Sequence, residues 1–134
     1  MTRHHGFTLL GLLLACVTLG AQAPTVHELT VAPERIHWGY YDARVKPVLR
    51  IASGDRVNVE TMIAGGLTRL RMLKVPDADI PKQLLAVESA ITDRGPGAHP
   101  MTGPMYVEGA EPGDAIEVRI LSIGFLHDYG INAF

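Results

Sequence analysis

Several short segments of this chain alternate polar and apolar residues with a period of two, which predicts β-strands. Residues 56–61 alternate as a half-buried strand should. Residues 115–123 place Ile116, Val118 and Ile120 on one face. Three shorter segments with strand-like composition lie at residues 25–29, 48–51 and 105–108. The pattern therefore predicts a mainly β fold built from short strands.

One stretch has helical spacing instead. Its apolar positions recur every three or four residues, at Ile80, Leu84, Val87 and Ile91. Pro81 falls where a first-turn proline is tolerated, and the Asp79 side chain can cap the first turn. We therefore predict a single helix over residues 81–92. Gly65 and Gly66 are expected to break the chain.

A turn followed by Gly-Asp and an alternating segment occurs twice, at residues 53–60 and 112–119. Glycine permits the positive φ of a tight turn, and aspartate can accept hydrogen bonds from the backbone beside it. Any β protein can reuse such a turn, but two copies favour the recurring corners of a sandwich or barrel. The 14 glycines and 9 prolines also favour many short strands. We expect a β-sandwich or barrel-like fold with one short helix.

The N-terminal residues predict an export signal. A short basic start is followed by an uncharged apolar run over residues 7–19 and by Ala21-Gln22-Ala23, a pattern that signal peptidase accepts. The run is shorter than the roughly 20 residues that span a bilayer. We assign residues 1–23 to a signal peptide and residues 24–134 to the mature domain, which is then periplasmic or secreted. Alternatively, residues 13–16 resemble a lipobox, and lipidation of Cys16 would attach the protein to a membrane.

Composition excludes some partners and chemistries. The net charge is −2 without a basic stripe, so no nucleic-acid partner is expected. Cys16 is the only cysteine, and its removal with the signal would exclude disulfides and a cysteine nucleophile. No G-x-S-x-G, H-E-x-x-H or P-loop motif occurs. If the protein is a hydrolase, a metal-activated water fits this inventory better than a serine or cysteine nucleophile.

Two histidines and one glutamate lie in segments that could carry chemistry. His37 precedes Trp38 and is followed five residues later by Asp42, and His99 lies among glycines and prolines that hold a backbone in place. Each imidazole could also simply cap backbone groups. Glu108 precedes the second Gly-Asp turn and could act as a general base, as a metal ligand or as a turn acceptor. The spacing leaves these alternatives open.

Two stretches of the mature chain resemble the acetamidase/formamidase family. The first covers residues 37–61, from His-Trp-Gly-Tyr-Tyr-Asp to Ser-Gly-Asp-Arg-Val-Asn-Val-Glu-Thr. The second, residues 99–114, reads His-Pro-Met-Thr-Gly-Pro-Met-Tyr-Val-Glu-Gly-Ala-Glu-Pro-Gly-Asp and is similar to the family's most distinctive stretch almost throughout. The resemblance extends over roughly residues 27–134, and a match of that length is more specific than any short motif.

The resemblance implies an enzyme that hydrolyses short linear amides to carboxylate and ammonia with a divalent metal, zinc being the expected one. Members of the family often form dimers, so the resemblance also allows a homodimer. Carried onto this chain, it implies His99 and Glu108 as catalytic residues and His37, Asp42 and His99 as metal ligands. Thr102 and Tyr41 are the expected substrate contacts.

The resemblance also implies a longer protein, because family members carry further histidine and acidic residues in a second half. We therefore expect this chain to be the N-terminal part of an incomplete domain and to be inactive alone. A competing hypothesis is an exported β-domain that binds a small ligand or partner without catalysis.

Overall fold

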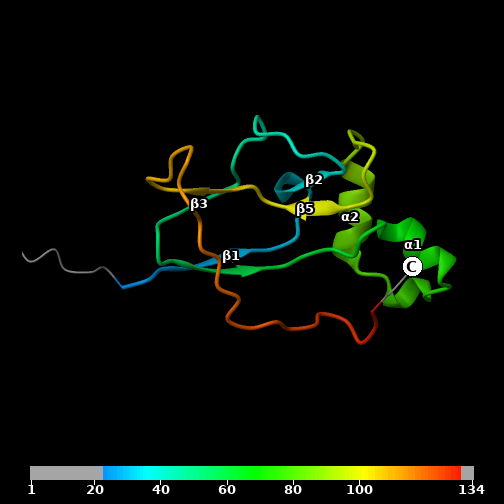
Figure 1. Ribbon diagram of the computed structural model, residues 1–134. Helices are drawn as coiled ribbons and strands as arrows, with labels where there is room; N and C mark the ends of the chain where they lie inside the picture. Colours follow the sequence, from blue (N-terminus) through cyan, green and yellow to red (C-terminus); the bar gives the residue numbers. More distant parts are fainter. Residues whose placement is uncertain (1–22, 131–134) are drawn as a thin grey trace, which may run out of the picture.

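Three pairs of short strands and two helices form the described part of the chain (Figure 1). The computed structural model describes residues 23–130. The strand pairs are β1 (Val26–Leu29) with β4 (Arg56–Val59), β2 (Ile36–Trp38) with β5 (Pro100–Thr102), and β3 (Leu49–Ile51) with β6 (Met105–Val107). The first and third pairs are parallel and the second is antiparallel. Each pair joins segments that are far apart in the sequence.

The helices are α1 (Gly66–Met72) and α2 (Lys82–Ala90), and short 3₁₀ turns lie at η1 (Pro33–Arg35) and η2 (Asp77–Asp79). Helix α2 confirms the predicted helix. The predicted Asp79 cap is wrong, because Asp79 closes η2 and Pro81 stands at the N-cap of α2 without any side-chain cap. The Pro81 carbonyl instead accepts the amides of Leu84 and Leu85.

Helix α2 packs against both hydrophobic clusters of the core. Val87 joins Ile36 and Trp38 of β2 in the first cluster, while Leu84 joins Leu70 and Ile80 in the second. Val87 and Leu84 are three residues apart on one face of the helix, as the periodicity predicts. The partly buried Met62 packs against both clusters. The core therefore lies where β2, α1 and α2 meet.

Helix α1 was not predicted, because Gly65 and Gly66 were interpreted as a break. Both glycines adopt positive φ values, 80° and 54°, and they start the helix instead. Gly66 is buried, and a Cβ there would lie 2.5 Å from Cη2 of Trp38 and also overlap the Glu88 carboxylate. Gly66, which helix propensity would predict to be a helix breaker, is thus required here because the close packing leaves no room for a side chain.

The predicted β-sandwich or barrel-like fold is a further point of difference. The three small sheets form no closed barrel within residues 23–130, and no sandwich is established. Strands and helices contribute comparable lengths, so the prediction of a mainly β fold is confirmed only for its short strands. Residues 115–123 form no strand, because no other described segment pairs with them. No helix in the described part has the length and apolarity to span a membrane.

Candidate functional site

The β2–β5 pair brings the two candidate histidines onto neighbouring segments. His37 of β2 lies opposite Met101 of β5, and Trp38 lies opposite Pro100. The pairing continues one residue further, since the Gly39 amide donates to the His99 carbonyl at 3.1 Å. His99 is exposed, whereas His37 is half-buried. Two segments more than 60 residues apart in sequence are therefore joined at the positions that the sequence analysis selected.

Close backbone contacts fix the loop that carries His99. The Gly95 amide donates to the Trp38 carbonyl at 2.9 Å and the Gly97 amide to the Gly39 carbonyl at 3.0 Å. A Cβ on Gly39, where φ is +81°, would lie 2.6 Å from the carbonyl oxygens of both Gly95 and Gly97. Only glycine allows the two backbones to approach so closely. The loop is thus held against the end of β2.

His37 has an imidazole nitrogen without a partner. Its Nδ1 is buried and makes no hydrogen bond to any described residue. Its ring centroid lies 6.1 Å from that of Tyr40. The Tyr40 hydroxyl lies 3.4 Å from Asp93 Oδ2, and the Asp93 charge raises the pKa of Tyr40. Neither Tyr40 nor Asp93 was predicted as a site residue, although Tyr40 lies inside the family-like segment.

Three further predicted site residues lie in or close to β2 and β5: Asp42, Tyr41 and Thr102. Asp42 and Thr102 bind residues other than the two histidines, and Tyr41 is exposed. The Asp42 carboxylate binds the Arg44 guanidinium at 2.7 Å, and hydrogen bonds from Arg44 lower the pKa of Asp42. Tyr41 is 91% exposed. The Thr102 hydroxyl donates to the Glu60 carbonyl at 2.8 Å. Thr102 therefore fastens β5 to the segment after β4, and none of the three contacts either histidine through a hydrogen bond in the described residues.

Glu108 belongs to a different pair of strands. It follows β6, and its amide donates to the Ile51 carbonyl of β3 at 2.8 Å. Its carboxylate accepts two hydrogen bonds from Arg50, at 2.6 and 3.1 Å, which lower the pKa of Glu108. The same guanidinium lies 3.9 Å from the centre of the Tyr106 ring. The structure thus joins Glu108 to Arg50 and Tyr106 and does not join it to His99 by a hydrogen bond.

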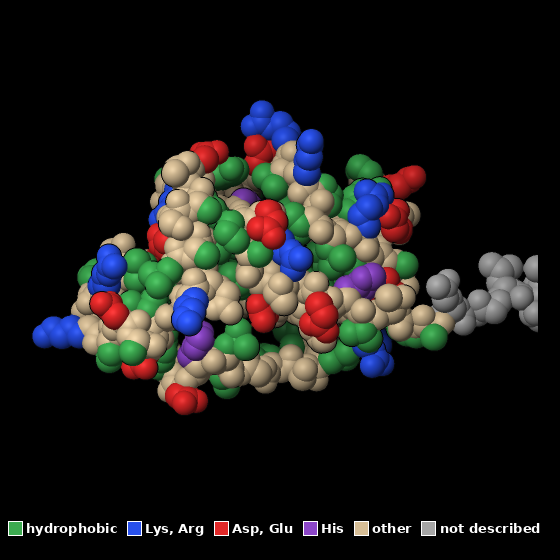
Figure 2. Space-filling view, turned by 180° about the vertical axis from the view of Figure 1, so that it is seen from behind, with side chains coloured by type: hydrophobic (Ala, Val, Ile, Leu, Met, Phe, Trp, Pro, Cys, Tyr) green, Lys and Arg blue, Asp and Glu red, His purple; other side chains and the backbone are tan. Residues whose placement is uncertain are grey.

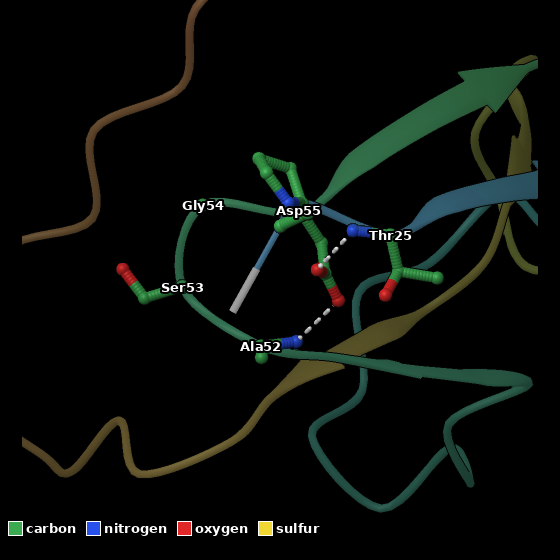
Figure 3. Close-up of a pocket in the computed structure, with 7 residues that line it drawn as sticks. Thr25, Ala52, Ser53, Gly54 and Asp55 are labelled. Carbon is green, nitrogen blue, oxygen red and sulfur yellow. Dashed lines mark hydrogen bonds between the residues drawn. The ribbon is translucent and has the colours of Figure 1, made fainter. Parts of the chain in front are cut away.

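A contact between a histidine and a carboxylate connects β1 to the turn before β4. It was not predicted from the sequence. His27 Nε2 lies 2.9 Å from Asp55 Oδ2, and the same carboxylate accepts the amides of Thr25 and Ala52 (Figure 3). The Ala52 amide, then His27 and Thr25, lower the pKa of Asp55 to about 2. A pocket of about 140 Å³ lies beside this turn. Asp55 therefore acts as the turn residue that the repeated Gly-Asp pattern predicts.

The described residues do not assemble a metal centre. No group of three or more His, Cys, Asp or Glu side chains within residues 23–130 is placed to hold a metal ion. Figure 2 shows histidines well separated on the rear face, with acidic and basic side chains interspersed between them. The predicted ligands His37, Asp42 and His99 therefore do not form a ligand set by themselves within these residues.

Comparison with known proteins gives one match. A profile described as the Acetamidase/Formamidase family matches residues 33–134. That range contains the β2–β5 pair, the glycine-fixed loop and the β3–β6 pair. Neither the curated proteins nor the solved structures yield a match.

Proposed function

Because the chain belongs to the Acetamidase/Formamidase family, we propose that it is an exported amidase that hydrolyses short linear amides to a carboxylate and ammonia. The observation that carries the proposal is the family match over residues 33–134, which includes the whole stretch from His99 to Asp114. The predicted signal at residues 1–23 lies largely outside the described residues and supports the location of the enzyme, in the periplasm or outside the cell.

Amide hydrolysis needs a proton at the leaving nitrogen, because ammonia leaves far more readily than an amide anion. We propose His99 for this transfer in place of the metal-ligand role that the resemblance also implies, because an imidazole bound to a metal ion cannot serve as the proton donor. Its side chain is exposed and its backbone is held by the contacts at Gly39. Glu108 is the proposed general base. Its hydrogen bonds from Arg50 lower the pKa of Glu108 and make the carboxylate a weaker base while they hold, so this role requires Arg50 to release it.

The metal dependence implied by the family resemblance is part of the proposal. His37 supports it with a buried Nδ1 that has no partner in the described residues. His37, Asp42 and His99 nevertheless do not fit a complete zinc site, since residues 23–130 supply no three-ligand group. A bound zinc ion would activate a water molecule, and its remaining ligands would come from outside these residues. We therefore expect little turnover from residues 23–130 alone.

Thr102 and Tyr41 remain the proposed substrate contacts.

The test measures ammonia release from formamide and acetamide by the protein as its own gene encodes it, with any residues that follow position 134, because the 134-residue chain is expected to be inactive alone. His99→Ala is expected to lower turnover by on the order of 10²-fold or more, the usual effect of removing a general acid or base. His127→Ala is the matched control, because His127 is also exposed but stacks on Tyr129 away from the β2–β5 pair. Circular dichroism checks that both variants fold. Equal turnover in the two variants would refute the role of His99.

A second arm of the same assay adds excess chelator and then zinc. Loss of ammonia release with chelator and its recovery with zinc are expected. Full activity in chelator would remove the metal from the proposal and leave amide hydrolysis standing.

The incomplete ligand group favours one other function, a non-catalytic domain that binds a small amide. Calorimetry with acetamide separates the two. Saturable binding without ammonia release from the natively expressed protein would favour the binding domain.

A further inference from the structure

The loop that carries His99 is held at both of its ends. At its start, the Arg94 guanidinium stacks 4.2 Å from the Trp38 ring, and a backbone bridge joins the same two residues. At its other end, the carbonyl of Ala98, the residue before His99, accepts the Gly65 amide at 2.8 Å. Gly65 is the N-cap of α1. The position of His99 therefore depends on Arg94 and on the start of α1.

One carboxylate, that of Glu88 in α2, binds both of these supports. Its Oε2 lies 2.7 Å from Arg94 Nη1, and Arg94 Nη2 donates to the Glu88 carbonyl at 2.8 Å. Its Oε1 accepts the amide of Leu67, the second residue of α1, at 2.7 Å. The Glu88 side chain is only 15% exposed, so few water molecules compete for these contacts. Each oxygen of this carboxylate thus serves a different end of the loop.

The start of α1 is built to receive this carboxylate. The first amides of a helix have no partner within the helix, and a side chain at the N-cap usually accepts one of them. Gly65 has no side chain for that purpose, and Glu88 of the other helix takes its place. Gly66 leaves room for it, because a Cβ on Gly66 would overlap the Glu88 carboxylate. The two glycines and Glu88 therefore form one structural unit.

We propose that Glu88 is a positioning residue for the His99 imidazole, because it holds both ends of the loop that carries this histidine. The inference rests on the proposed amidase function, in which His99 transfers a proton to the leaving nitrogen. Such a transfer needs close alignment, and a displacement of about 1 Å caused by a remote change can lower a rate on the order of 10²-fold. The side-chain hydrogen bonds of Glu88 within residues 23–130 go to Leu67 and Arg94 and not to His99, so Glu88 acts through the loop.

Glu88→Gln tests the need for two acceptor oxygens. Glutamine has the same shape, but its NH₂ group is a donor and cannot accept from the Leu67 amide or from Arg94. In the protein as its own gene encodes it, the variant should lower kcat for ammonia release about tenfold or more and change KM less than about twofold. Glu117→Gln is the matched control, because Glu117 pairs with Arg119 at 2.6 Å but is 72% exposed and lies outside the loop. Unchanged kcat in Glu88→Gln would overturn the proposal.

Repeating Glu88→Gln in the His99→Ala background separates positioning from stability. Without an imidazole to position, the substitution should change the residual turnover less than about twofold. A purely structural role would lower turnover by the same factor in both backgrounds, and that result would also overturn the proposal. Circular dichroism at the assay temperature checks that each variant is folded.

Hydrogen exchange measures the loop contact without relying on activity. Glu88→Gln should speed exchange of the Gly65 amide, whose acceptor is the Ala98 carbonyl, about tenfold or more. The Arg56 amide is the internal control, because it donates to the Thr25 carbonyl at 2.9 Å beside the β1–β4 pair, and its rate should not change. Equal acceleration of both amides would indicate global destabilisation and would contradict the proposal.

The two measurements distinguish failure of this inference from failure of the proposed function. A wild type that releases no ammonia would refute the amidase function and with it a catalytic purpose for the loop. A Gly65 amide that exchanges at the wild-type rate in Glu88→Gln would refute the role of Glu88 whether or not the protein hydrolyses amides.

Discussion

At the scale of single residues, Asp55 shows how one carboxylate stabilises a junction between distant segments. It accepts hydrogen bonds from the backbone amides of Thr25 and Ala52 and from the His27 ring. The side chain is only 12% exposed, so few water molecules compete for its oxygens. These bonds favour the ionised carboxylate and lower its pKa from 3.8 to about 2. The stability of the β1–β4 junction therefore depends on the charge of one group.

Asp55→Asn is predicted to lower the thermal midpoint, with an effect that depends on pH. Because the pKa of Asp55 is lowered in the folded state, the ionised group stabilises the fold above pH 3.8, and this contribution is lost as the pH falls toward 2. The difference between wild type and variant should be largest near neutral pH and should shrink below about pH 4. Thermal melts followed by circular dichroism from pH 2 to 7 measure it.

Asp114→Asn is the matched control for this prediction. Asp114 occupies the same place in the second Gly-Asp turn but accepts only the Glu111 amide, at 2.9 Å, and has no histidine partner in the described residues. Asp114→Asn should therefore lower the thermal midpoint less than Asp55→Asn does. A pH-independent difference between wild type and Asp55→Asn would contradict the assigned cause.

At the scale of elements, the β2–β5 pair depends on a crossing of two backbones at Gly39. The chain after β2 and the loop before β5 exchange hydrogen bonds through Gly39, Gly95 and Gly97. The guanidinium of Arg94 stacks 4.2 Å from the Trp38 ring and pairs with Glu88 of α2 at 2.7 Å. The loop that carries His99 is therefore fastened to a strand and to a helix at once.

Gly39→Ala is predicted to destabilise the fold more than Gly109→Ala. Both glycines have positive φ, +81° and +76°, so both substitutions place alanine in a left-handed conformation that costs about 1–2 kcal/mol. A Cβ at Gly109 meets nothing within 4 Å, whereas at Gly39 it meets two carbonyl oxygens. Displacing that backbone should add about 1–3 kcal/mol.

Urea unfolding of the two glycine variants gives both free energies of unfolding under one condition. The comparison isolates the steric effect, because the conformational cost is nearly the same at the two positions. Equal losses of stability would mean that the crossing at Gly39 relaxes without cost.

At the scale of the whole molecule, a small core contrasts with a large exposed apolar segment. Six of the seven buried hydrophobic side chains of the described residues belong to the two clusters around α2, which Met62 joins, and the seventh is Leu29 of β1. The long apolar segment at residues 115–126 contributes nothing to either cluster. The molecule thus carries apolar surface at residues 115–126 that its own described residues leave exposed.

Export of the whole chain is a separate prediction that concerns residues 1–23. In a bacterial cell, the exported form should begin near Pro24, as measured by intact mass and N-terminal sequencing. Fatty-acid labelling with and without Cys16→Ser distinguishes the alternative anchor. Label that depends on Cys16 would replace the cleaved signal with a lipoprotein, and a cytoplasmic chain of full length would contradict export altogether.

Much of the local structure was predictable, and the failures have physical causes. Strands β1, β3, β4 and β6 and helix α2 lie where polar and apolar patterns place them, because burial of one face dictates those patterns. Helix α1 was not predicted because glycine has a low helix propensity. Gly66 is nevertheless required in this helix, since a side chain at that position would clash with Trp38.

Some features of the candidate site were likewise predictable from the sequence, and others were not. His37 was selected because Asp42 follows it five residues later, and His99 was selected from its glycine- and proline-rich surroundings. The structure places the two histidines on paired segments. The partners of Asp42 and Glu108 were not predicted. Arg50 lies 58 residues from Glu108, and no spacing rule connects positions so far apart.

The sequence by itself determined the family, the main secondary-structure elements and the turn role of Asp55, because each depends on residues that are neighbours along the chain. Only the tertiary structure decided that His37 and His99 lie on paired segments, that Arg50 holds Glu108, and that residues 115–126 remain without a partner in the described part. These outcomes depend on which distant segments approach one another. Burial and steric fit across the whole molecule govern which segments approach, and a local sequence pattern does not predict either of them.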